Sequence, residues 1–401
     1  MRPDAFSSQA RGVVRKDPTG FWAFHPAPLP RRLDLPHDVV NLLDEATGAV
    51  HRLGGVGRLI PNPHLLIAPH VRLEAVLSSR IEGTKTDVGQ LLRFEAGETP
   101  PADEADDAQE VENYVIAMEH GLERLREGFP MSVRLLREMH ERLLSGVRGR
   151  HRRPGELRSS PVWIGGSTLG DAVFVPPPPD EMQVALSDLE RFLHANDLPL
   201  LISIGLAHYQ FETIHPFMDG NGRIGRLLIA LMLVWSGALP QPLLYLSVYF
   251  EQHRGEYYDH LLITSQQGDF YPWLRFFLRG VRRQARDAEE RTVRLVELQH
   301  QLRNELLEEG RRNTVVRLAE HLFSVPLTTP VRAEQVLGVT RPTAQAAIEA
   351  LVERGDLVEV TGRGRGRIYE APRIFKAVYG TVEVPEVGHE RQLSFNMDPE
   401  R

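Results

Sequence analysis

Cysteine is absent from this chain of 401 residues. Its absence excludes disulfide bonds, cysteine-ligated zinc and thiol catalysis, and nothing indicates an oxidising compartment. Long apolar runs are also missing, since the strongest one, residues 227–235, is far shorter than the ~18 residues of a membrane-spanning helix. The N-terminus reads Met1-Arg2-Pro3-Asp4 with no apolar segment behind it. We therefore predict no signal peptide and a cytoplasmic location.

A strong excess of one charge is lacking as well. The formal net charge is −7, which argues against bulk binding of nucleic acid or anionic membranes but leaves a local basic patch open. Hydrophobic residues make up 42% of the chain and charged residues 25%, as in ordinary globular proteins. A chain of this length exceeds one ordinary core, so we expect two or three domains.

Helical periodicity dominates what is present, and the predicted fold class is mainly α. Helices are expected over residues 38–53, about 68–81, 107–128, 132–144, 179–195, 198–214 and 222–237, with more between 250 and 287. A polar, acidic stretch at 95–110 is predicted to be a surface loop. Residues 162–175 differ, because two β-prone runs flank a glycine-rich turn. They predict a β-hairpin.

The C-terminal part has a pattern of its own. Residues 286–312 are predicted to form a charged connector helix, and helices over 315–322, 332–337 and 340–354 then precede two strands within 357–369. This order of elements is typical of a winged helix. Basic side chains that could meet DNA phosphates are Arg341, Arg363, Arg365 and Arg367. A module that packs against protein is the alternative, and the sequence leaves both open.

The clearest chemistry lies in residues 215–226, HPFMDGNGRIGR. Gly220 and Gly222 let backbone N–H groups approach an anion, and the following helix directs its positive N-terminus to the same place. Arg223 and Arg226 lie three positions apart on one helix face, where both can hold phosphate oxygens. The segment therefore predicts a polyphosphate site.

Two more side chains complete this segment. Asp219 is a hard oxygen ligand suited to Mg²⁺, which usually takes one or two carboxylates plus phosphates. His215 can accept a hydroxyl proton near neutral pH. The plain alternative is a helix–loop–helix whose glycines make a turn and whose arginines face water. The combination of all these groups in one short segment favours a functional site.

The same segment resembles the signature of Fic-domain proteins, His-x-Phe-x-Asp/Glu-Gly-Asn-Gly-Arg-x-x-Arg, at every defined position. The likeness extends over roughly residues 100–280, through the core helices and the hairpin. It implies transfer of a nucleotide, usually AMP from ATP, to a Ser, Thr or Tyr hydroxyl of a target protein. Relatives that transfer phosphate tend to have Lys where this chain has Gly222, so the resemblance favours AMP.

The resemblance also implies residue roles. His215 would deprotonate the target hydroxyl, Asp219 would bind Mg²⁺, and Phe217 would anchor the loop in the core. The nucleotide-binding residues of the loop would be Gly220, Asn221, Gly222, Arg223, Ile224, Gly225 and Arg226. Of these, the Gly-Asn-Gly stretch would form the anion hole, and the two arginines would hold the β- and γ-phosphates.

Residues outside the loop are implicated in the same way. Ile164 and Gly165, in the hairpin, would act as a flap that contacts the target or the nucleotide through strand pairing, with an ordinary structural hairpin as the alternative. Tyr258 and Gln266 stand where relatives contact the nucleotide. Core packing is an equally good interpretation of these two residues.

Upstream, Ser78-x-x-x-Glu82-Gly83 resembles the family's inhibitory pattern, Ser/Thr-x-x-x-Glu-Gly/Asn. A Ser four residues before a Glu is common on helix surfaces, but here the pair lies upstream of a complete motif. Ser78 and Glu82 would stack on one helix face, and Glu82 could then pair with Arg226 in place of the γ-phosphate. In some relatives this glutamate also supports removal of AMP, which the sequence leaves open.

The first predicted domain is an N-terminal helical region at 1–100, which contains the inhibitory helix at about 68–83. The second is a Fic core at 101–285, which contains the flap at about 162–175 and the catalytic loop at 215–226. The connector at 286–312, the winged helix at 313–380 and a disordered tail at 381–401 follow. The expected cofactor is Mg²⁺, with ATP as the substrate. The expected partner is a target protein, which can be the chain itself, and relatives make a homodimer plausible. The alternative function is a DNA-binding regulator whose Fic domain only senses nucleotide.

Overall fold

The computed structural model describes residues 1–18, 20–59, 63–147, 153–362 and 366–380. It is mainly helical, as predicted, with two small antiparallel sheets. The helices of the main body are α1 (His37–Leu59), α2 (Pro63–Ile81), α3 (Val88–Glu95), α4 (Ala102–Arg126), α5 (Val133–Leu143), α6 (Pro179–Leu193), α7 (Leu200–Ile214), α8 (Asn221–Trp235), α9 (Ser247–Gln252), α10 (Arg254–Gln267) and α11 (Tyr271–Glu308). The predicted tail at 381–401 lies outside the described residues.

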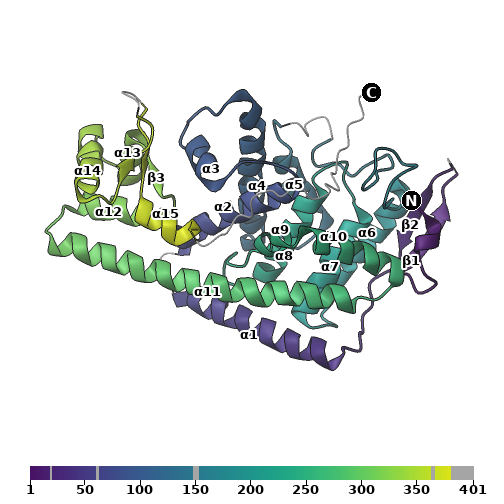
Figure 1. Ribbon diagram of the computed structural model, residues 1–401. Coiled ribbons are helices and arrows are strands. Elements are labelled where there is room, and N and C mark those ends of the chain that lie inside the picture. The colour runs from purple at the N-terminus through teal and green to yellow at the C-terminus, as the bar shows by residue number, and fades with distance from the viewer. Residues whose placement is uncertain (19, 60–62, 148–152, 363–365, 381–401) are drawn as a thin grey trace.

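Helices α7 and α8 form the centre of the larger core (Figure 1). Nearly every residue of both is buried, and a helix that is apolar on all sides is stable only when neighbours cover it. Helices α6, α10 and α11 contact α7, while α4 and α5 contact α8. The loop between these two helices is residues 215–220, so the most tightly packed part of the molecule positions the segment with the clearest chemistry.

The N-terminal segment forms a hairpin that the sequence analysis did not predict. β1 (Gly12–Lys16) pairs antiparallel with β2 (Trp22–Pro26). Each strand has five residues, which is too short for an alternating pattern to stand out in a sequence. Two neighbouring helices also differ from prediction, because α3 was not expected and α4 begins inside the stretch 95–110 that was predicted as a loop.

The hairpin predicted over 162–175 is narrower than expected. It is held by one antiparallel bridge, in which Ile164 and Phe174 exchange backbone hydrogen bonds of 2.8 and 3.1 Å. Gly165 and Gly166 both have positive φ values, 67° and 81°, so the chain leaves the extended conformation directly after the bridge. Past the bridge, the carbonyl of Val175 accepts a hydrogen bond from the N–H of Phe24 in β2.

Helix α11 joins the main body to a C-terminal module. The connector predicted at 286–312 is the second half of this helix, and α1 packs along its first half (Figure 1). The module consists of α12 (Asn313–His321), β3 (Leu327–Thr328), α13 (Pro330–Leu337), α14 (Arg341–Arg354), β4 (Val358–Glu359), β5 (Tyr369–Glu370) and α15 (Pro372–Tyr379). Its sheet has the order β3-β5-β4. Arg363 and Arg365 of the predicted wing lie outside the described residues.

Helix α2 belongs to both hydrophobic cores. Ala75 and Val76 pack in the core of the main body, whereas Leu73 and Leu77 pack with the C-terminal module. Helix α15 also contacts α2 directly. A shift of α2 would therefore disturb packing on both sides, and the position of this helix depends on the C-terminal module as well as on the main body.

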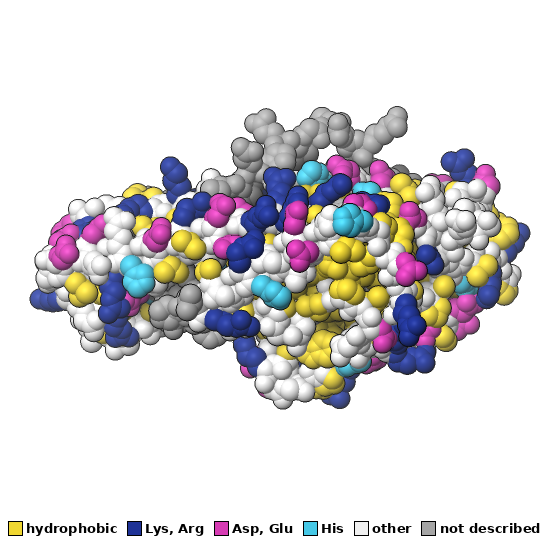
Figure 2. Space-filling model, turned by 90° about the horizontal axis from the view of Figure 1, so that it is seen from below, with side chains coloured by type: hydrophobic (Ala, Val, Ile, Leu, Met, Phe, Trp, Pro, Cys, Tyr) yellow, Lys and Arg dark blue, Asp and Glu magenta, His cyan; other side chains and the backbone are white. Residues whose placement is uncertain are grey.

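The surface carries both signs of charge. Figure 2 shows one face on which hydrophobic side chains gather in one area while Lys, Arg, Asp and Glu are spread over the rest. No helix of the described residues combines the length and the apolar character that crossing a membrane would need.

Candidate active site

The loop between α7 and α8 is closed on itself by one asparagine. The Asn221 side chain accepts a hydrogen bond from the N–H of Phe217 (2.8 Å) and donates one to its carbonyl (2.9 Å). The Phe217 ring is 1% exposed and anchors the loop in the core. Because the Asn221 amide is engaged within the loop, the group it can offer an anion is its backbone N–H.

His140 of α5 supports the same loop through contacts with Asp219 and Phe217. Its Nε2–H donates to the carbonyl of Asp219 (3.0 Å), and its Nδ1 accepts from the N–H of Gly155 (2.9 Å). Its ring stacks on Phe217, with 3.8 Å between ring centroids. Burial lowers the pKa of His140 to about 4, so the ring is neutral and keeps this pattern of one donor and one acceptor. No local sequence pattern marks this histidine, which lies 79 positions before Asp219.

Arg158 holds the end of α7. It is 1% exposed, and it donates to the carbonyls of His215 (2.8 Å), Ile214 (3.3 Å) and Pro177 (2.5 Å). Carbonyls at a helix C-terminus lack partners inside the helix, and the guanidinium satisfies them. Burial lowers the pKa of Arg158 to about 10, which leaves it charged at neutral pH. The sequence analysis missed this residue as well.

His215 ends α7 in an unusual backbone conformation. Its φ is 50° and its ψ is 63°, a left-handed geometry that non-glycine residues rarely adopt and that often occurs at functional sites. Its Nδ1–H donates to the carbonyl of Glu212 (3.2 Å), which leaves Nε2 as the proton acceptor. Burial lowers the pKa of His215 to about 4. The imidazole is therefore neutral, and able to take a proton, at pH 7.

The N-terminus of α8 faces the same region and suits an anion. Gly220 precedes the helix with a φ of 74°, and the N–H groups of the first helical turn lack partners inside the helix. Together with the helix dipole, these groups attract phosphate. A Cβ on Gly222 would lie 2.3 Å from Oε1 of Glu82. The space in front of this turn is thus already occupied by a carboxylate.

Asp219 and Arg223 lie beside this helix end. Arg223 is 5% exposed, and it pairs with Glu110 of α4 at 3.2 Å and with Asp219 at 3.9 Å. The Asp219 carboxylate accepts from the N–H of Gly220 (2.6 Å) and is 47% exposed. Among the described residues, no group of three or more His, Cys, Asp or Glu could hold a metal alone. One accessible carboxylate fits Mg²⁺ that takes its other ligands from phosphates and water.

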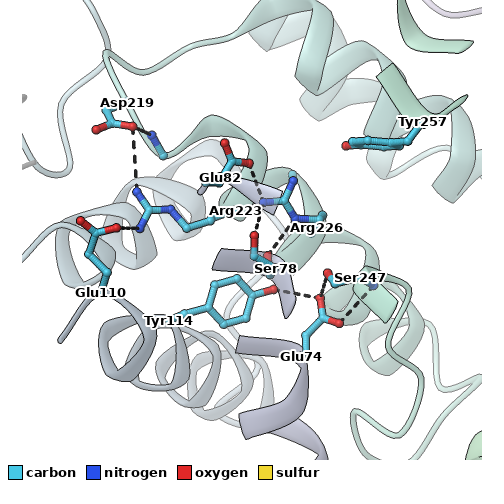
Figure 3. A network of polar contacts seen from close by, with 12 residues as sticks. Glu74, Ser78, Glu82, Glu110, Tyr114, Asp219, Arg223, Arg226, Ser247 and Tyr257 are labelled. Carbon is cyan, nitrogen blue, oxygen red and sulfur yellow. Dashed lines mark hydrogen bonds and ion pairs between the residues drawn. The ribbon is translucent and has the colours of Figure 1, made fainter. Parts of the chain in front are cut away.

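Arg226 is bound by Ser78 of α2 and by Glu82 directly after this helix, the two residues of the predicted inhibitory pattern (Figure 3). Its Nε donates to Ser78 Oγ (2.8 Å), and its Nη2 donates to the Ser78 carbonyl (2.9 Å) and to Glu82 Oε1 (2.6 Å). The guanidinium is 1% exposed, whereas the Glu82 side chain is 22% exposed. Nη1 of Arg226 is buried with no partner among the described residues. The structure thus brings together Ser78, Glu82 and Arg226, the three residues that the sequence pattern indicated for this contact.

A buried glutamate fixes the helix that carries these residues. Glu74 lies one turn before Ser78 and is 3% exposed. Its carboxylate accepts from the hydroxyls of Ser247 (2.5 Å) and Tyr114 (3.1 Å) and from the N–H of Ser247 (3.3 Å), as Figure 3 shows. Burial raises the pKa of Glu74. These bonds tie α2 to α4 and α9, and the sequence analysis did not identify Glu74.

A largely apolar cavity lies between the 162–175 hairpin and α10, next to the C-terminal end of α7. Ile164, Gly165 and Tyr258 line it, so the structure brings three of the predicted residues to one place. Gln266 is not among its lining residues, and its backbone carbonyl accepts a hydrogen bond from the N–H of Ser7. Glu212 also lines the cavity, although the sequence analysis did not single it out.

Comparison with known proteins agrees with this geometry. Residues 40–123 match the Fic/DOC family N-terminal model, and residues 130–233 match the Fic/DOC family model. Curated relatives include "Protein adenylyltransferase Fic" of Culex quinquefasciatus, 34% identical over 163 residues, and of Drosophila melanogaster, 31% identical over 174 residues. The matches cover 40% and 43% of this chain but only 28% and 32% of those relatives.

Two solved structures share the fold. A Fic family protein from Desulfovibrio desulfuricans superposes with a TM-score of 0.54 at 24% identity, covering 86% of this chain and 98% of that one. Fic-1 from C. elegans (residues 134–508) superposes with a TM-score of 0.50 at 23% identity, covering 65% of this chain and 74% of that one. The chain therefore contains a region at residues 40–123 that matches the Fic/DOC N-terminal model, followed by a Fic domain at residues 130–233.

Proposed function

We propose that this chain is a protein adenylyltransferase, which transfers AMP from ATP to a Ser, Thr or Tyr hydroxyl of a target protein. The main support is the juxtaposition of a neutral His215 with the α8 N-terminus, one accessible carboxylate and two buried arginines. Its curated relatives carry the name protein adenylyltransferase. The proposal extends that activity to a chain that spans about a third or less of their length.

The proton transfer follows from the state of the imidazole. His215 Nε2 takes the proton of the target hydroxyl while the hydroxyl oxygen forms a bond to the α-phosphorus. The bond from the α-phosphorus to the bridging oxygen breaks, and pyrophosphate leaves with that electron pair. Asp219 would hold Mg²⁺, which neutralises charge that develops on the phosphates. Arg158 holds the backbone carbonyl of His215, and the Glu212 carbonyl holds Nδ1 of its ring, so that Nε2 would stay directed toward the target hydroxyl.

Phosphate binding would fall to α8. The N–H groups of its first turn would hold phosphate oxygens, Arg223 would contact the β-phosphate and Arg226 the γ-phosphate. Glu110 pairs with Arg223 and thereby fixes the direction of that guanidinium. The buried Nη1 of Arg226 has no partner among the described residues, so Arg226 has donor capacity left for a phosphate oxygen.

The base of the nucleotide would occupy the apolar cavity. This cavity adjoins α7 through Glu212 and Thr213 and is lined on its other sides by the hairpin and α10. Apolar and aromatic walls suit a flat base, and Tyr258 supplies one of them. Ile164 and Gly165, on the hairpin side, would lie between the nucleotide and an incoming target segment.

Glu82 would act as a brake on this reaction. It occupies Arg226 and the space in front of Gly222, and both are needed by the terminal phosphate in the proposed binding mode. A negative carboxylate would also repel the triphosphate. ATP would then bind weakly or with its α-phosphate out of line with the attacking hydroxyl.

Intact mass spectrometry after incubation with ATP and Mg²⁺ tests the activity. The Glu82→Gly variant should gain the mass of one or more AMP groups, or transfer them to added target protein, while the native chain gains much less. His51, which is exposed on α1, provides a control, because His51→Ala should leave the gain unchanged. A Glu82→Gly protein that neither gains AMP nor modifies any other protein contradicts the proposal.

A further inference from the structure

One polar group in the apolar cavity has no hydrogen-bond partner. Oε1 of Glu212 is buried, and no described residue bonds to it. Two other polar side chains of the wall are engaged: Thr213 Oγ1 donates to the Tyr209 carbonyl (2.8 Å), and Ser265 Oγ pairs with the Tyr209 hydroxyl (2.9 Å). A buried carboxyl without a partner costs free energy. It is therefore a candidate for binding a ligand.

The packing of α7 against α8 holds this carboxyl in place. A Cβ on Gly225 would lie 2.2 Å from Glu212 Oε1, so the carboxyl rests against the backbone of α8 in a space that only a glycine leaves free. Glu212 lies on α7 one turn before His215, and it is half-buried at the cavity wall. A base in the cavity would thus meet this carboxyl beside the catalytic imidazole.

We propose that the Glu212 carboxyl accepts a hydrogen bond from the exocyclic amine of the nucleotide base and so gives the site its preference for adenine over a purine without that amine. This role rests on the proposed nucleotide site, and it adds a base-recognition residue that the Fic signature does not include. The remaining cavity walls, among them Ile164, Val173, Phe174, Leu261 and Leu262, are apolar and would contact the faces of the base.

The protonation of Glu212 fits this role. Burial raises its pKa to about 8, while Arg226 lowers it and Glu82 raises it. At neutral pH the carboxyl is therefore largely protonated, and its carbonyl oxygen accepts from the amine. The ionised form still accepts from the amine. A base that offers the amine would give this carboxyl a hydrogen-bond partner in both states.

Calorimetric titration with two nucleotides tests this inference. ATP and purine riboside triphosphate differ only in the exocyclic amine, and both are titrated with Mg²⁺ into the Glu82→Gly protein and into Glu82→Gly/Glu212→Ala. The first protein should bind ATP about tenfold more tightly, the ratio expected for one hydrogen bond of ~1.4 kcal/mol. In the second protein this preference should fall below about twofold, with the affinity for purine riboside triphosphate little changed.

Two further variants keep the result interpretable. Glu212→Gln retains a carbonyl acceptor and should keep most of the preference for ATP even if Glu212→Ala folds poorly. Glu256 is exposed on α10 and does not line the cavity, and Glu256→Gln should leave the preference intact. Equal affinities for both nucleotides in the Glu82→Gly protein would overturn the inference. A tenfold preference that survives Glu212→Ala, or equal weakening of both nucleotides in that variant, would do the same.

The affinities also separate this inference from the proposed function. They are measured without any transfer step, so a protein that fails to transfer AMP can still show whether Glu212 distinguishes the two bases. Absence of binding by either nucleotide would contradict the nucleotide site itself, and with it the role of Glu212. Transfer of AMP with equal affinity for both nucleotides would leave the proposed function standing and remove Glu212 from base recognition.

Discussion

Arg226 is the residue at which the proposed nucleotide binding and the proposed inhibition meet. Its buried guanidinium binds Glu82 at 2.6 Å, and the γ-phosphate would need the same guanidinium. Glu82→Gly removes the competing carboxylate, so we predict that ATP binds about 10- to 100-fold more tightly, the range that matches a charge-assisted hydrogen bond of ~1.5–3 kcal/mol. Calorimetric titration with ATP measures this change. Glu82→Gln keeps the length of the side chain without its charge and should give an intermediate affinity, and an unchanged affinity in both variants would contradict the competition.

His215 sets the expected pH dependence. Burial lowers its pKa to about 4, and only the neutral ring can accept a proton, so activity is lost as the pH falls toward this value. We predict that transfer by the Glu82→Gly protein stays constant through pH ~6.5, where a free histidine would be half protonated. His215→Ala should lower the rate by about 10²- to 10⁴-fold. Initial rates measured over a pH series give both results, and a midpoint near 6.5 would contradict the neutral, buried imidazole.

The residues that the sequence predicted are those whose partners lie within one segment. The loop from His215 to Arg226 carries its chemistry in consecutive positions, and the Ser78 and Glu82 spacing indicates one helix face. Glu110, His140 and Arg158 reach the site because segments far apart in the sequence pack together, so no local pattern marks them. Asn221 is predicted to serve the anion, and because its side chain closes the loop, its backbone N–H is the group left for that role. An amide can do either, and only the fold decides between them.

Among the elements, α2 is the one whose position determines the contacts made to Arg226. Glu74, Ser78 and Glu82 are spaced four residues apart and lie along one side of the helix, where the first anchors the helix and the last two bind Arg226. Sequence periodicity located this helix to within a few residues. It could not predict the anchor, because Ser247 and Tyr114 come from two other helices.

Loss of the Glu74 anchor should destabilise the protein. Glu74→Ala leaves the buried Tyr114 hydroxyl and the Ser247 hydroxyl and N–H without their acceptor, which we expect to lower the free energy of unfolding by about 2–4 kcal/mol. Denaturant unfolding followed by circular dichroism measures the change. Glu74→Gln keeps one acceptor oxygen and should cost less. An Ala variant as stable as the native chain would show that this network contributes little.

The hairpin at 162–175 shows where strand prediction from sequence reaches its limit. Its β-prone residues predict two antiparallel strands. The two segments do run antiparallel, but their backbones pair at the Ile164–Phe174 bridge instead of along full strands. Gly165 and Gly166 take positive φ values, and Phe24 from the N-terminal hairpin occupies the carbonyl of Val175. A partner strand far away in the sequence therefore limits the pairing, and residue pattern alone does not contain that information.

At the scale of the whole molecule, α11 links the two cores. The sequence placed a separate connector at 286–312, whereas the helix runs unbroken from Tyr271 to Glu308. Gly280 lies inside this helix, and a Cβ there would lie 2.6 Å from the Tyr249 ring. This glycine therefore serves close packing inside a continuous helix. The C-terminal module is fixed to the end of that helix and to α2.

This arrangement predicts that the C-terminal module supports the brake. Arg291 of α11 is 3% exposed and donates to the carbonyl of Val378 in α15 (2.9 Å), and α15 contacts α2. Arg291→Ala should loosen α15 and α2 and raise AMP transfer several-fold, with no further gain in the Glu82→Gly background. Arg294 on the same helix is 47% exposed and pairs with Glu290 at 4.0 Å, so Arg294→Ala serves as the matched control. Equal rates for both variants in labelling assays would contradict this support.

The N-terminus of α8 and His215 are proposed to transfer AMP rather than phosphate. The most direct test supplies the Glu82→Gly protein and Mg²⁺ with ATP radiolabelled at the α-phosphate or at the γ-phosphate and measures the label that remains on protein after denaturation. We predict retention of the α-label alone, and its loss in Glu82→Gly/His215→Ala. Retention of the γ-label, or α-labelling that does not depend on His215, would contradict the account.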